Sequence, residues 1–240
     1  MSVVRTVLVT GGAGGIGRAI AAAFRDLGDD VVVADLRDAD VAATSLGIRG
    51  VAIDITDEDS IAAALERIGP VDVLVNNAGL LTVHGRLMEL PGADMLRILR
   101  TNAHGTFLMT QQVARQLVSR GRGGAVVNLS SIGARQPTPG MGGYECSKAA
   151  VDALTRWSAI ELAEHGIRVN AVAPGPVLTP MLAAGLPAGS PARQAWLDRI
   201  PLRELATVEA VAAAVVFLAS DVAAHITGVS LPVDGGQLLT

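Results

Sequence analysis

The chain has 240 residues, half of them apolar, with one cysteine and a formal net charge of -4 at pH 7. This length suffices for one α/β domain with a sizeable core, and the scattered arginines offer no basic surface for nucleic acid. Cys146 alone cannot form an intramolecular disulfide, and the N-terminus shows no apolar signal segment, so we expect a cytoplasmic protein with no nucleic-acid or membrane partner.

A glycine-rich loop lies between the first predicted strand, Val3 to Thr10, and the first predicted helix, Arg18 to Leu27. Its glycines include Gly11, Gly15 and Gly17. Glycines between a buried strand and a helix let the backbone approach a pyrophosphate, whose charge then lies at the helix N-terminus. A tight structural turn explains the glycines alone equally well, but the flanking strand and helix favour a dinucleotide site.

Asp35 follows the second predicted strand, Val31 to Ala34, eighteen residues after the glycine loop. A carboxylate there can accept hydrogen bonds from the adenosine ribose hydroxyls and would repel a 2′-phosphate. Neither Gly14 nor Gly15 supplies a cation for such a phosphate. NAD is therefore favoured over NADP, although Arg37 lies close enough to keep NADP open.

Strands and helices continue to alternate, which predicts a parallel sheet built through right-handed crossovers. The expected fold is a doubly wound, Rossmann-type α/β domain of about seven strands with helices on both faces, spanning residues 1–240. Further strands are predicted at Val51 to Ile55 (carrying Asp54), Val71 to Val75, Ala125 to Ser131, Ile167 to Ala173 and Val229 to Val233. Helices are predicted at Asp57 to Ile68, Pro91 to Arg120, around Tyr144 to about Glu164, and Thr207 to Ala219.

The longest uncharged stretch, Val169 to Ala192, could span a bilayer by length. It contains five prolines, which disrupt helices, so we predict a loop.

Tyr144 is the only tyrosine and Lys148 the only lysine, and they stand four residues apart. At this spacing on a helix both side chains share one face. A nearby ammonium favours the phenolate and lowers the pKa of a phenol, which suits general acid–base catalysis near neutral pH. An exposed pair on an ordinary helix surface is the alternative. Cys146, on a different helical face, is expected to be buried and inert.

Together, several motifs resemble the short-chain dehydrogenase/reductase family over nearly the whole chain. They are Thr10-Gly11-x-x-x-Gly15-Ile16-Gly17, Asp54, Asn76-Asn77-Ala78-Gly79, Asn102, Ser131, Tyr144-x-x-x-Lys148, Pro174-Gly175 with Thr179, and Asp234-Gly235-Gly236.

The resemblance implies a catalytic set of Asn102, Ser131, Tyr144 and Lys148. Ser131 and Tyr144 would hydrogen-bond the substrate oxygen, and Tyr144 would take its proton. Lys148 would hold the nicotinamide ribose and depress the pKa of the tyrosine, while Asn102 would hold a water. Ser131 is chosen over Ser130 because it precedes the tyrosine by thirteen residues, and neighbouring strand residues face opposite sides of a sheet.

The same resemblance implies which residues contact the cofactor, expected to be NAD, and the substrate. The cofactor set is Gly11, Gly15, Ile16, Gly17, Asp35, Asp54, Ile55, Asn77, Ala78, Gly79, Tyr144, Lys148, Pro174, Gly175, Val177 and Thr179. The substrate set is Ser131, Gln136, Met141, Tyr144 and Met181, with a lid at about residues 180–205. His84 is interpreted as a loop bystander, and no metal site is predicted.

The leading hypothesis is an NAD-dependent oxidoreductase that acts on a secondary alcohol, such as a polyol or sugar, or on the corresponding ketone. The nearest alternative is an NADPH-dependent reductase of 3-oxoacyl thioesters. Epimerases of nucleotide sugars also use a Tyr-x-x-x-Lys pair, but their glycine spacing is shorter and their chains longer. A non-enzymatic dinucleotide sensor would need a damaged catalytic set.

A homotetramer is expected, because residues 106–118 and 149–162 carry apolar side chains on more faces than one sheet could cover.

Overall fold

The computed structural model describes residues 4–81 and 84–240, except for the side chains of Pro180 and Met181. Its described residues form one seven-stranded sheet with the strand order β3-β2-β1-β4-β5-β6-β7, in which every pairing is parallel. The strands are β1 (Thr6–Thr10), β2 (Asp30–Asp35), β3 (Arg49–Ala52), β4 (Val73–Asn76), β5 (Gly124–Leu129), β6 (Ile167–Pro174) and β7 (Ser230–Val233). The predicted doubly wound fold is confirmed.

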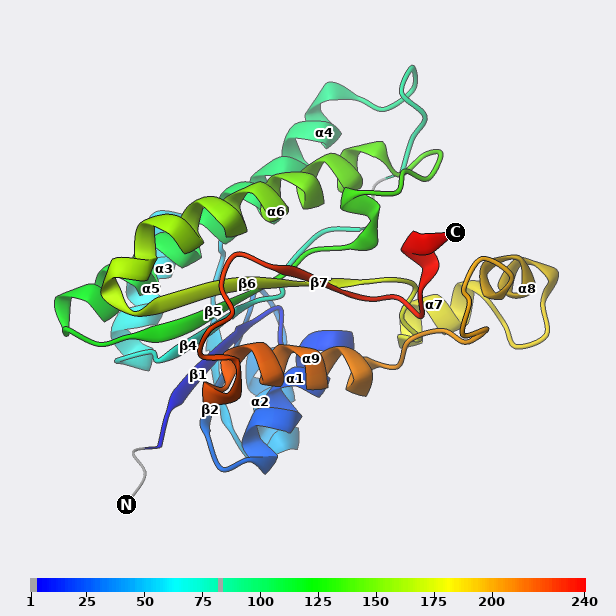
Figure 1. Cartoon of the computed structure of the whole chain (residues 1–240). Coiled ribbons are helices and arrows are strands. Elements are labelled where there is room, and N and C mark those ends of the chain that lie inside the picture. The colour runs from blue at the N-terminus through cyan, green and yellow to red at the C-terminus, as the bar shows by residue number, and fades with distance from the viewer. Residues whose placement is uncertain (1–3, 82–83) are drawn as a thin grey trace.

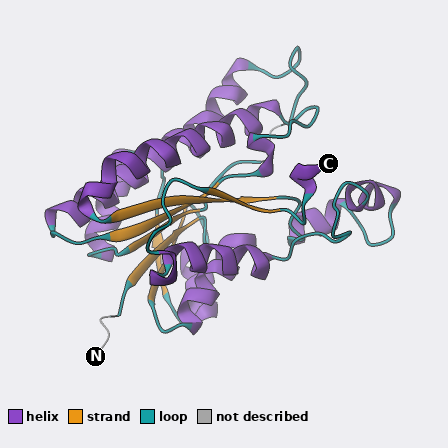
Figure 2. Cartoon of the chain, in the orientation of Figure 1, coloured by secondary structure: helices purple, strands orange, loops and turns teal. Residues whose placement is uncertain are grey.

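Helices cover both faces of the sheet (Figures 1 and 2). They are α1 (Gly15–Asp26), α2 (Ala39–Leu46), α3 (Glu58–Ile68), α4 (Gly92–Leu99), α5 (Thr106–Ser119), α6 (Gly142–Leu162), α7 (Pro180–Gly185), α8 (Pro191–Leu197) and α9 (Val208–Ala219). Helices α1, α2 and α9 pack on one face, and α3, α5 and α6 pack on the other.

Alternation along the strands divides the core into two layers. In β1, Val7 and Val9 contact the cluster that includes Phe24 of α1, whereas Leu8 contacts the cluster that includes Ile61 of α3. All five side chains are fully buried. Successive strand residues point to opposite faces, so an unbroken apolar run supplies both layers at once.

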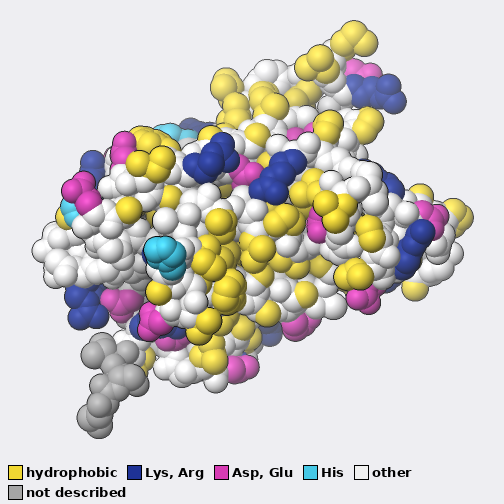
Figure 3. All heavy atoms as spheres, in the orientation of Figure 1, with side chains coloured by type: hydrophobic (Ala, Val, Ile, Leu, Met, Phe, Trp, Pro, Cys, Tyr) yellow, Lys and Arg dark blue, Asp and Glu magenta, His cyan; other side chains and the backbone are white. Residues whose placement is uncertain are grey.

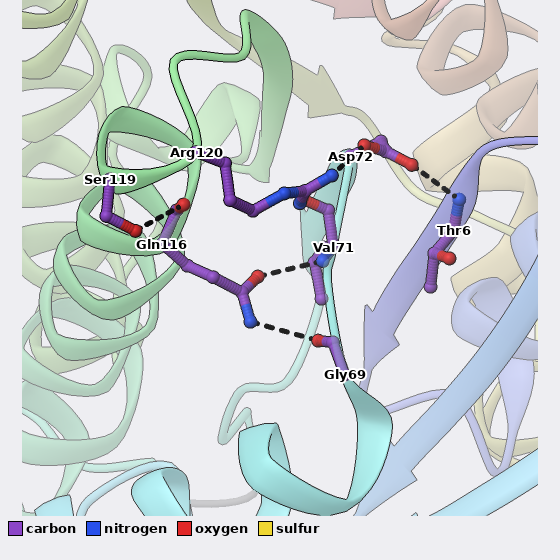
Figure 4. A network of polar contacts seen from close by, with 7 residues as sticks. All are labelled: Thr6, Gly69, Val71, Asp72, Gln116, Ser119 and Arg120. Atoms are coloured by element: carbon purple, nitrogen blue, oxygen red, sulfur yellow. Dashed lines mark hydrogen bonds and ion pairs between the residues drawn. The ribbon is translucent and has the colours of Figure 1, made fainter.

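A polar network fixes the amino end of β4 to helix α5, at the sheet edge opposite the glycine loop (Figure 4). The Gln116 side chain accepts a hydrogen bond from Val71 N at 2.8 Å and donates to Gly69 O at 3.0 Å. Arg120 forms an ion pair with Asp72 at 3.1 Å. These contacts satisfy backbone groups that precede the strand. The candidate site lies at the other end of β4.

The long helical stretch predicted from about Pro91 to Arg120 is confirmed: α4, a π-helix at Arg100–Gly105 and α5 follow one another without a break. Other predictions were wrong. Helix α2 was not predicted, and α7 with the start of α8 lies in the proline-rich stretch predicted as a loop. Pro180 and Pro191 each stand at the first turn of their helix, where the missing N–H costs nothing.

Two predicted strands end earlier than expected, which changes the setting of two site residues. Strand β3 ends at Ala52, so Asp54 lies in the following turn, and β5 ends at Leu129, so Ser131 lies beyond the strand. Ser131 therefore takes no part in the strand alternation from which it was predicted.

The strand order reverses between β1 and β4, whose neighbours lead to opposite edges of the sheet. In parallel α/β sheets, ligands bind beyond the carboxyl ends of the strands at such a point. The glycine loop after β1 and Asn77 after β4 lie there.

Candidate active site

The glycine loop is closely packed where a side chain would block it. A Cβ on Gly17 would collide with Gly11 O and lie 2.5 Å from Asn77 Nδ2. Gly11 has a φ of +62°, and a Cβ there would lie 2.7 Å from the Ala78 Cα. By contrast, a Cβ on Gly14 would meet nothing within 4 Å. The loop is therefore fixed on its protein side and open on the other.

Polar side chains join this loop to the end of β4. Asn77 Nδ2 donates to Thr10 O at 3.1 Å and to Gly11 O at 2.8 Å. The Thr10 hydroxyl accepts from the backbone N–H groups of Asn77 and Ala78 at 3.1 and 3.2 Å. The predicted cofactor residues Gly11, Asn77 and Ala78 thus form one rigid unit.

Among the described residues, no side chain caps the start of helix α1 at Gly14. The N–H groups of the first turn of a helix lack partners within the helix, so this end can bind an anion. Asp35 ends β2 as predicted, and its carboxylate accepts hydrogen bonds from Ala13 N at 3.1 Å and Leu36 N at 2.8 Å. An acidic side chain therefore stands beside the loop, and the two features fit the pyrophosphate and a ribose of a dinucleotide.

Asp54 and Ile55 follow β3 at the same edge. Asp54 Oδ1 accepts from the N–H and the hydroxyl of Thr56, both at 2.8 Å, which fixes the turn before α3. Ile55 is buried against the π-helix, where a Cβ on Gly105 would lie 2.7 Å from Ile55 Cδ1.

Lys148 of α6 is buried, with 6 % of its surface exposed. Its ammonium donates to Leu129 O at 2.6 Å and lies 5.6 Å from the centre of the Tyr144 ring. An added Cβ on Gly79 would lie 3.7 Å from Lys148 Nζ, so the end of β4 reaches the same point. The predicted pair does share one helical face inside the fold.

Burial lowers the pKa of Lys148 from 10.5 to about 8, although the Asp152 carboxylate acts in the opposite direction. The folded chain thus holds this proton less tightly than the unfolded chain. The sign follows: the cost of burying the charge is present in full below pH 8 and is relieved as the pH rises to 10.5. This shift corresponds to about 3 kcal/mol.

Burial raises the pKa of Tyr144, while the Ser131 hydroxyl lowers it and the Glu145 carboxylate raises it further. The net shift of the Tyr144 pKa is therefore upward, opposite to the direction predicted from Lys148. Desolvation of the phenolate outweighs the hydrogen bond from Ser131, because burial removes the hydration that stabilises the charged form.

Asn102 lies in the π-helix and is buried. Its Nδ2 donates to Leu80 O at 3.0 Å and to the Ser147 hydroxyl at 2.9 Å, and its Oδ1 accepts from Leu80 N at 2.7 Å. Ser147 in turn donates to Tyr144 O at 2.6 Å. The side chain thus orients the segment after β4 against α6. π-Helical turns occur often at functional sites.

The two adjacent serines have different roles in the fold. Ser130 is buried and donates to Lys148 O at 3.3 Å, which ties α6 to the end of β5. Ser131 is partly exposed, caps the short turn Ile132–Ala134, and accepts from Gly133 N at 3.0 Å. Its hydroxyl interacts with Tyr144. The structure therefore places Ser131, and not Ser130, beside the phenol.

The remaining predicted cofactor residues follow β6. A Cβ on Gly175 would lie 3.1 Å from the Asp234 Cα, so the segment after β7 packs closely on it. Val177 forms a bridge with Ala206, and the Thr179 hydroxyl caps α7 by accepting from Leu182 N at 3.2 Å. Asp234 itself accepts from Gly236 N and Leu238 N, which explains the terminal Asp-Gly-Gly as a turn.

The predicted substrate residues are divided between the two sides of the site. Met141 Sδ lies 3.0 Å from His84 Nδ1, so His84 contacts a predicted substrate residue. The Gln136 side chain is hydrogen-bonded to the C-terminal residues: its Nε2 donates to Thr240 O at 3.3 Å, and its Oε1 accepts from Gln237 Nε2 at 3.3 Å. The Met181 side chain lies outside the described residues.

Cys146 is exposed, so the prediction that it is buried was wrong. Its two neighbours in the chain, Glu145 and Ser147, are buried instead. Two charged residues near the site were also missed. Glu145 accepts from Thr138 N at 2.6 Å, and Asp152 is buried 3.7 Å from Arg135. The position of Asp152, four residues after Lys148, is a sequence signal that could have found it.

Across residues 4–81 and 84–240, no helix is long and apolar enough to cross a membrane. The same residues contain no group of three or more His, Cys, Asp or Glu side chains that could hold a metal ion.

The parallel sheet, the glycine loop at its switch point and the Tyr144–Lys148 pair together indicate an enzyme that uses a dinucleotide cofactor. Comparisons with known proteins agree with this class. Residues 11–237 match a family model described as enoyl-(acyl carrier protein) reductase. The chain is 40 % identical to an L-rhamnose 1-dehydrogenase (NAD(P)(+)) from Sphingomonas sp. (strain SKA58), covering 97 % of this chain and 96 % of that protein. It is 36 % identical to 3-oxoacyl-[acyl-carrier-protein] reductase of Thermotoga maritima, covering 98 % of each chain.

A solved structure titled short chain dehydrogenase/reductase family protein superposes with a TM-score of 0.88, at 37 % identity and 98 % coverage of both chains. The chain belongs to the short-chain dehydrogenase/reductase family, as the sequence motifs predicted. It is an oxidoreductase that binds a nicotinamide cofactor, NAD or NADP.

Proposed function

We propose that this protein is an NAD-dependent oxidoreductase that interconverts a secondary alcohol, such as a polyol or sugar, and its ketone. The observation that carries the proposal is the buried Lys148 ammonium beside Tyr144, with the Ser131 hydroxyl next to the phenol. The sugar dehydrogenase among the relatives supports the substrate class.

In this proposal the nicotinamide, when bound, supplies the acceptor for hydride from the carbinol carbon. Ser131 and Tyr144 bind the substrate oxygen, and the Tyr144 phenolate accepts the hydroxyl proton. Lys148 holds the nicotinamide ribose and stabilises the phenolate by its charge. Asn102 holds α6 against the segment that follows β4, through its hydrogen bonds to Leu80 and Ser147.

The preference for NAD rests on Asp35. Its carboxylate ends β2 beside the glycine loop, where it can accept from ribose hydroxyls and repel a 2′-phosphate. Like charges placed together cost several kcal/mol. Arg37 is exposed two residues later and is the cation that could counter this effect.

The purified protein is expected to reduce NAD with at least one member of a panel of secondary alcohols, polyols and sugars, as measured by absorbance of the reduced cofactor. The kcat/KM with NAD should exceed that with NADP. Asp35→Ser should lower this ratio about tenfold or more, which corresponds to about 1.4 kcal/mol. The matched control Asp40→Ser, which removes an exposed carboxylate from α2, should leave the ratio unchanged. A wild-type preference for NADP would contradict the cofactor proposal.

The alternative function is reduction of 3-oxoacyl thioesters with NADPH. It is supported by the 3-oxoacyl reductase among the relatives. The same panel separates the two, because a higher kcat/KM for an acetoacetyl thioester with NADPH than for every alcohol with NAD would favour the alternative.

We also propose a homotetramer, because two separate apolar surfaces are exposed. On the first, Phe107 stacks on Trp157 with ring centres 6.0 Å apart, beside a depression of about 430 Å³. Trp157 is 50 % exposed. The second lies on the face that carries α9 and β7, where hydrophobic side chains gather (Figure 3). Phe217 of α9 and Val222, in the turn that follows α9, are exposed. A tetramer with twofold axes needs two different self-complementary surfaces.

Light scattering should therefore give about four times the chain mass of 24.5 kDa at micromolar concentration. Trp157→Glu should reduce this mass to a dimer, because it places a charge in one surface and leaves the other intact. Val41→Glu, at an exposed position of α2, is the control and should remain tetrameric. A wild-type mass near that of one chain would rule the proposal out.

Two further assignments remain proposals. We propose that residues 180–205 form a substrate lid, since they carry α7 and α8 between the end of β6 and α9. We propose that residues 1–240 act as one cytoplasmic domain, since all described strands belong to one sheet and the sequence holds a single cysteine.

A further inference from the structure

Asp152 is a buried carboxylate that the proposed reaction does not use. It lies on α6, four residues after Lys148, and 6 % of its surface is exposed, the same fraction as for Lys148. Side chains four residues apart lie on one face of a helix, one turn from each other. An acid and a base are therefore buried together on one face of α6.

The fold compensates this carboxylate only in part. Its Oδ2 lies 3.7 Å from Arg135 Nε, which is longer than a charge-assisted hydrogen bond. Arg135 is exposed to water, and its Nη2 donates to Ser230 O at 2.8 Å. The Asp152 Oδ1 atom is buried and, among the described residues, has no hydrogen-bond partner. Burying an ionised carboxylate is costly unless cations compensate it, so a second cation is needed beside Arg135.

Lys148 has the complementary need. Among the described residues its ammonium forms no ion pair, and it donates to a neutral carbonyl, Leu129 O, at 2.6 Å. Burial lowers the pKa of Lys148 to about 8, and the Asp152 carboxylate acts to raise it. An opposite charge favours the charged form of its neighbour without direct contact, because charges inside a protein are screened less than charges in water.

Other charged groups near α6 act elsewhere. Glu145, the other buried acid of this helix, accepts from Thr138 N at 2.6 Å and acts on Tyr144. The phenol of Tyr144 is neutral below its raised pKa. The remaining charged or titratable residues on elements that pack against α6 pair with each other, donate to backbone carbonyls or are exposed: Asp94 with Arg97, Arg100 and Arg168, and His104, Arg115, Glu164 and His165.

We propose that Asp152 is a positioning residue for catalysis, whose carboxylate keeps Lys148 in the charged form that binds the nicotinamide ribose and stabilises the Tyr144 phenolate. Arg135 anchors the same carboxylate to the loop after Ser131. The consequence for catalysis rests on the proposed function, whereas the effect on the Lys148 charge does not. Without the carboxylate, the desolvated ammonium gives up its proton at a lower pH, and a neutral amine cannot stabilise the phenolate by charge.

The single lysine of the chain makes this charge directly measurable. Protein labelled with ¹³C at the ε carbon of lysine gives one signal, whose chemical shift reports the proton of Lys148 during a pH titration. Asp152→Asn keeps the size of the side chain and removes its charge, so the midpoint should fall by about one pH unit. Asp152→Glu, which restores the charge, should recover most of this fall. Glu164→Gln, at an exposed position after the same helix, is the control and should leave the midpoint unchanged.

The kinetic measurement is kcat with NAD for an alcohol that the wild type oxidises. The fraction of protonated Lys148 differs little between the two proteins well below both midpoints and differs about tenfold well above them. Asp152→Asn should therefore match the wild-type kcat near about pH 6 and lose about tenfold by about pH 9. A structural role alone would give a loss that does not change with pH.

An unchanged Lys148 midpoint in Asp152→Asn overturns the proposal, whether or not kcat falls. A wild-type midpoint below about pH 7 also overturns it, because the ammonium would then not be kept charged at neutral pH. That measurement needs no variant, so it decides the matter even if Asp152→Asn fails to fold. A lowered midpoint with an unchanged kcat profile would support the effect of Asp152 on the Lys148 charge and refute the role of that charge in the proposed function.

Discussion

Lys148→Arg is expected to fold but to lose about a hundredfold or more of the wild-type kcat, despite keeping the charge. Lys148 Nζ is held 2.6 Å from Leu129 O, and the Gly79 backbone lies close beside it. A planar guanidinium is larger than an ammonium and fixes its donors in a fork, so it cannot occupy the same point. A displacement of about 1 Å at a reacting centre costs on the order of a hundredfold in rate.

The pH dependence gives a second readout of the same change. Oxidation needs the phenolate, and burial raises the pKa of Tyr144, so the oxidation rate should rise with pH in the wild type. Displacing the cation removes stabilisation from the phenolate, and the rising limb should move to still higher pH in Lys148→Arg. Steady-state kcat measured from about pH 6 to pH 10 decides this, since the range spans the pKa of about 8 of Lys148 and approaches the raised pKa of Tyr144 from below.

Arg67→Lys, on the exposed face of α3, is the matched control for a basic exchange and should leave both kcat and the profile unchanged. Near-normal turnover of Lys148→Arg with an unshifted profile would mean that the site does not require a compact ammonium. The survival of one lysine among so many arginines would then need another explanation.

Gly17→Ala is expected to weaken cofactor binding by about a hundredfold or more and to destabilise the fold by about 1–3 kcal/mol or more. The added methyl would collide with Gly11 O and lie 2.5 Å from Asn77 Nδ2. The glycine loop and the start of α1 must then separate, which moves the helix N-terminus away from the pyrophosphate position. Fluorescence titration with NADH and thermal unfolding measure the two effects.

Gly14→Ala is the control within the same loop. Its φ of -149° is extended backbone, and its Cβ would meet nothing within 4 Å, so its stability should change little. Its effect on NADH affinity shows how closely the cofactor approaches this residue. Wild-type stability and affinity in Gly17→Ala would contradict the packing described for this loop.

The fold class and several features of the candidate site were predictable from the residues alone. Apolar β-branched runs alternating with helical periodicity dictate a parallel sheet, because both faces of each strand must be buried. The end of β2 at Asp35, the glycine loop before α1, and Tyr144 and Lys148 on one face of α6 were all predicted from local spacing. These features depend on residues close together in the chain, so a local pattern is enough to specify them.

The surroundings of those residues became known only from the packed fold. Burial raises the pKa of Tyr144 against the expected direction, Cys146 is exposed, and Gln237 near the C-terminus donates a hydrogen bond to Gln136. Desolvation depends on how many groups from distant elements exclude water around a side chain, and a hydrogen bond depends on which of them come within about 3 Å. Neither quantity is carried by sequence spacing, because both arise only when separate segments pack together.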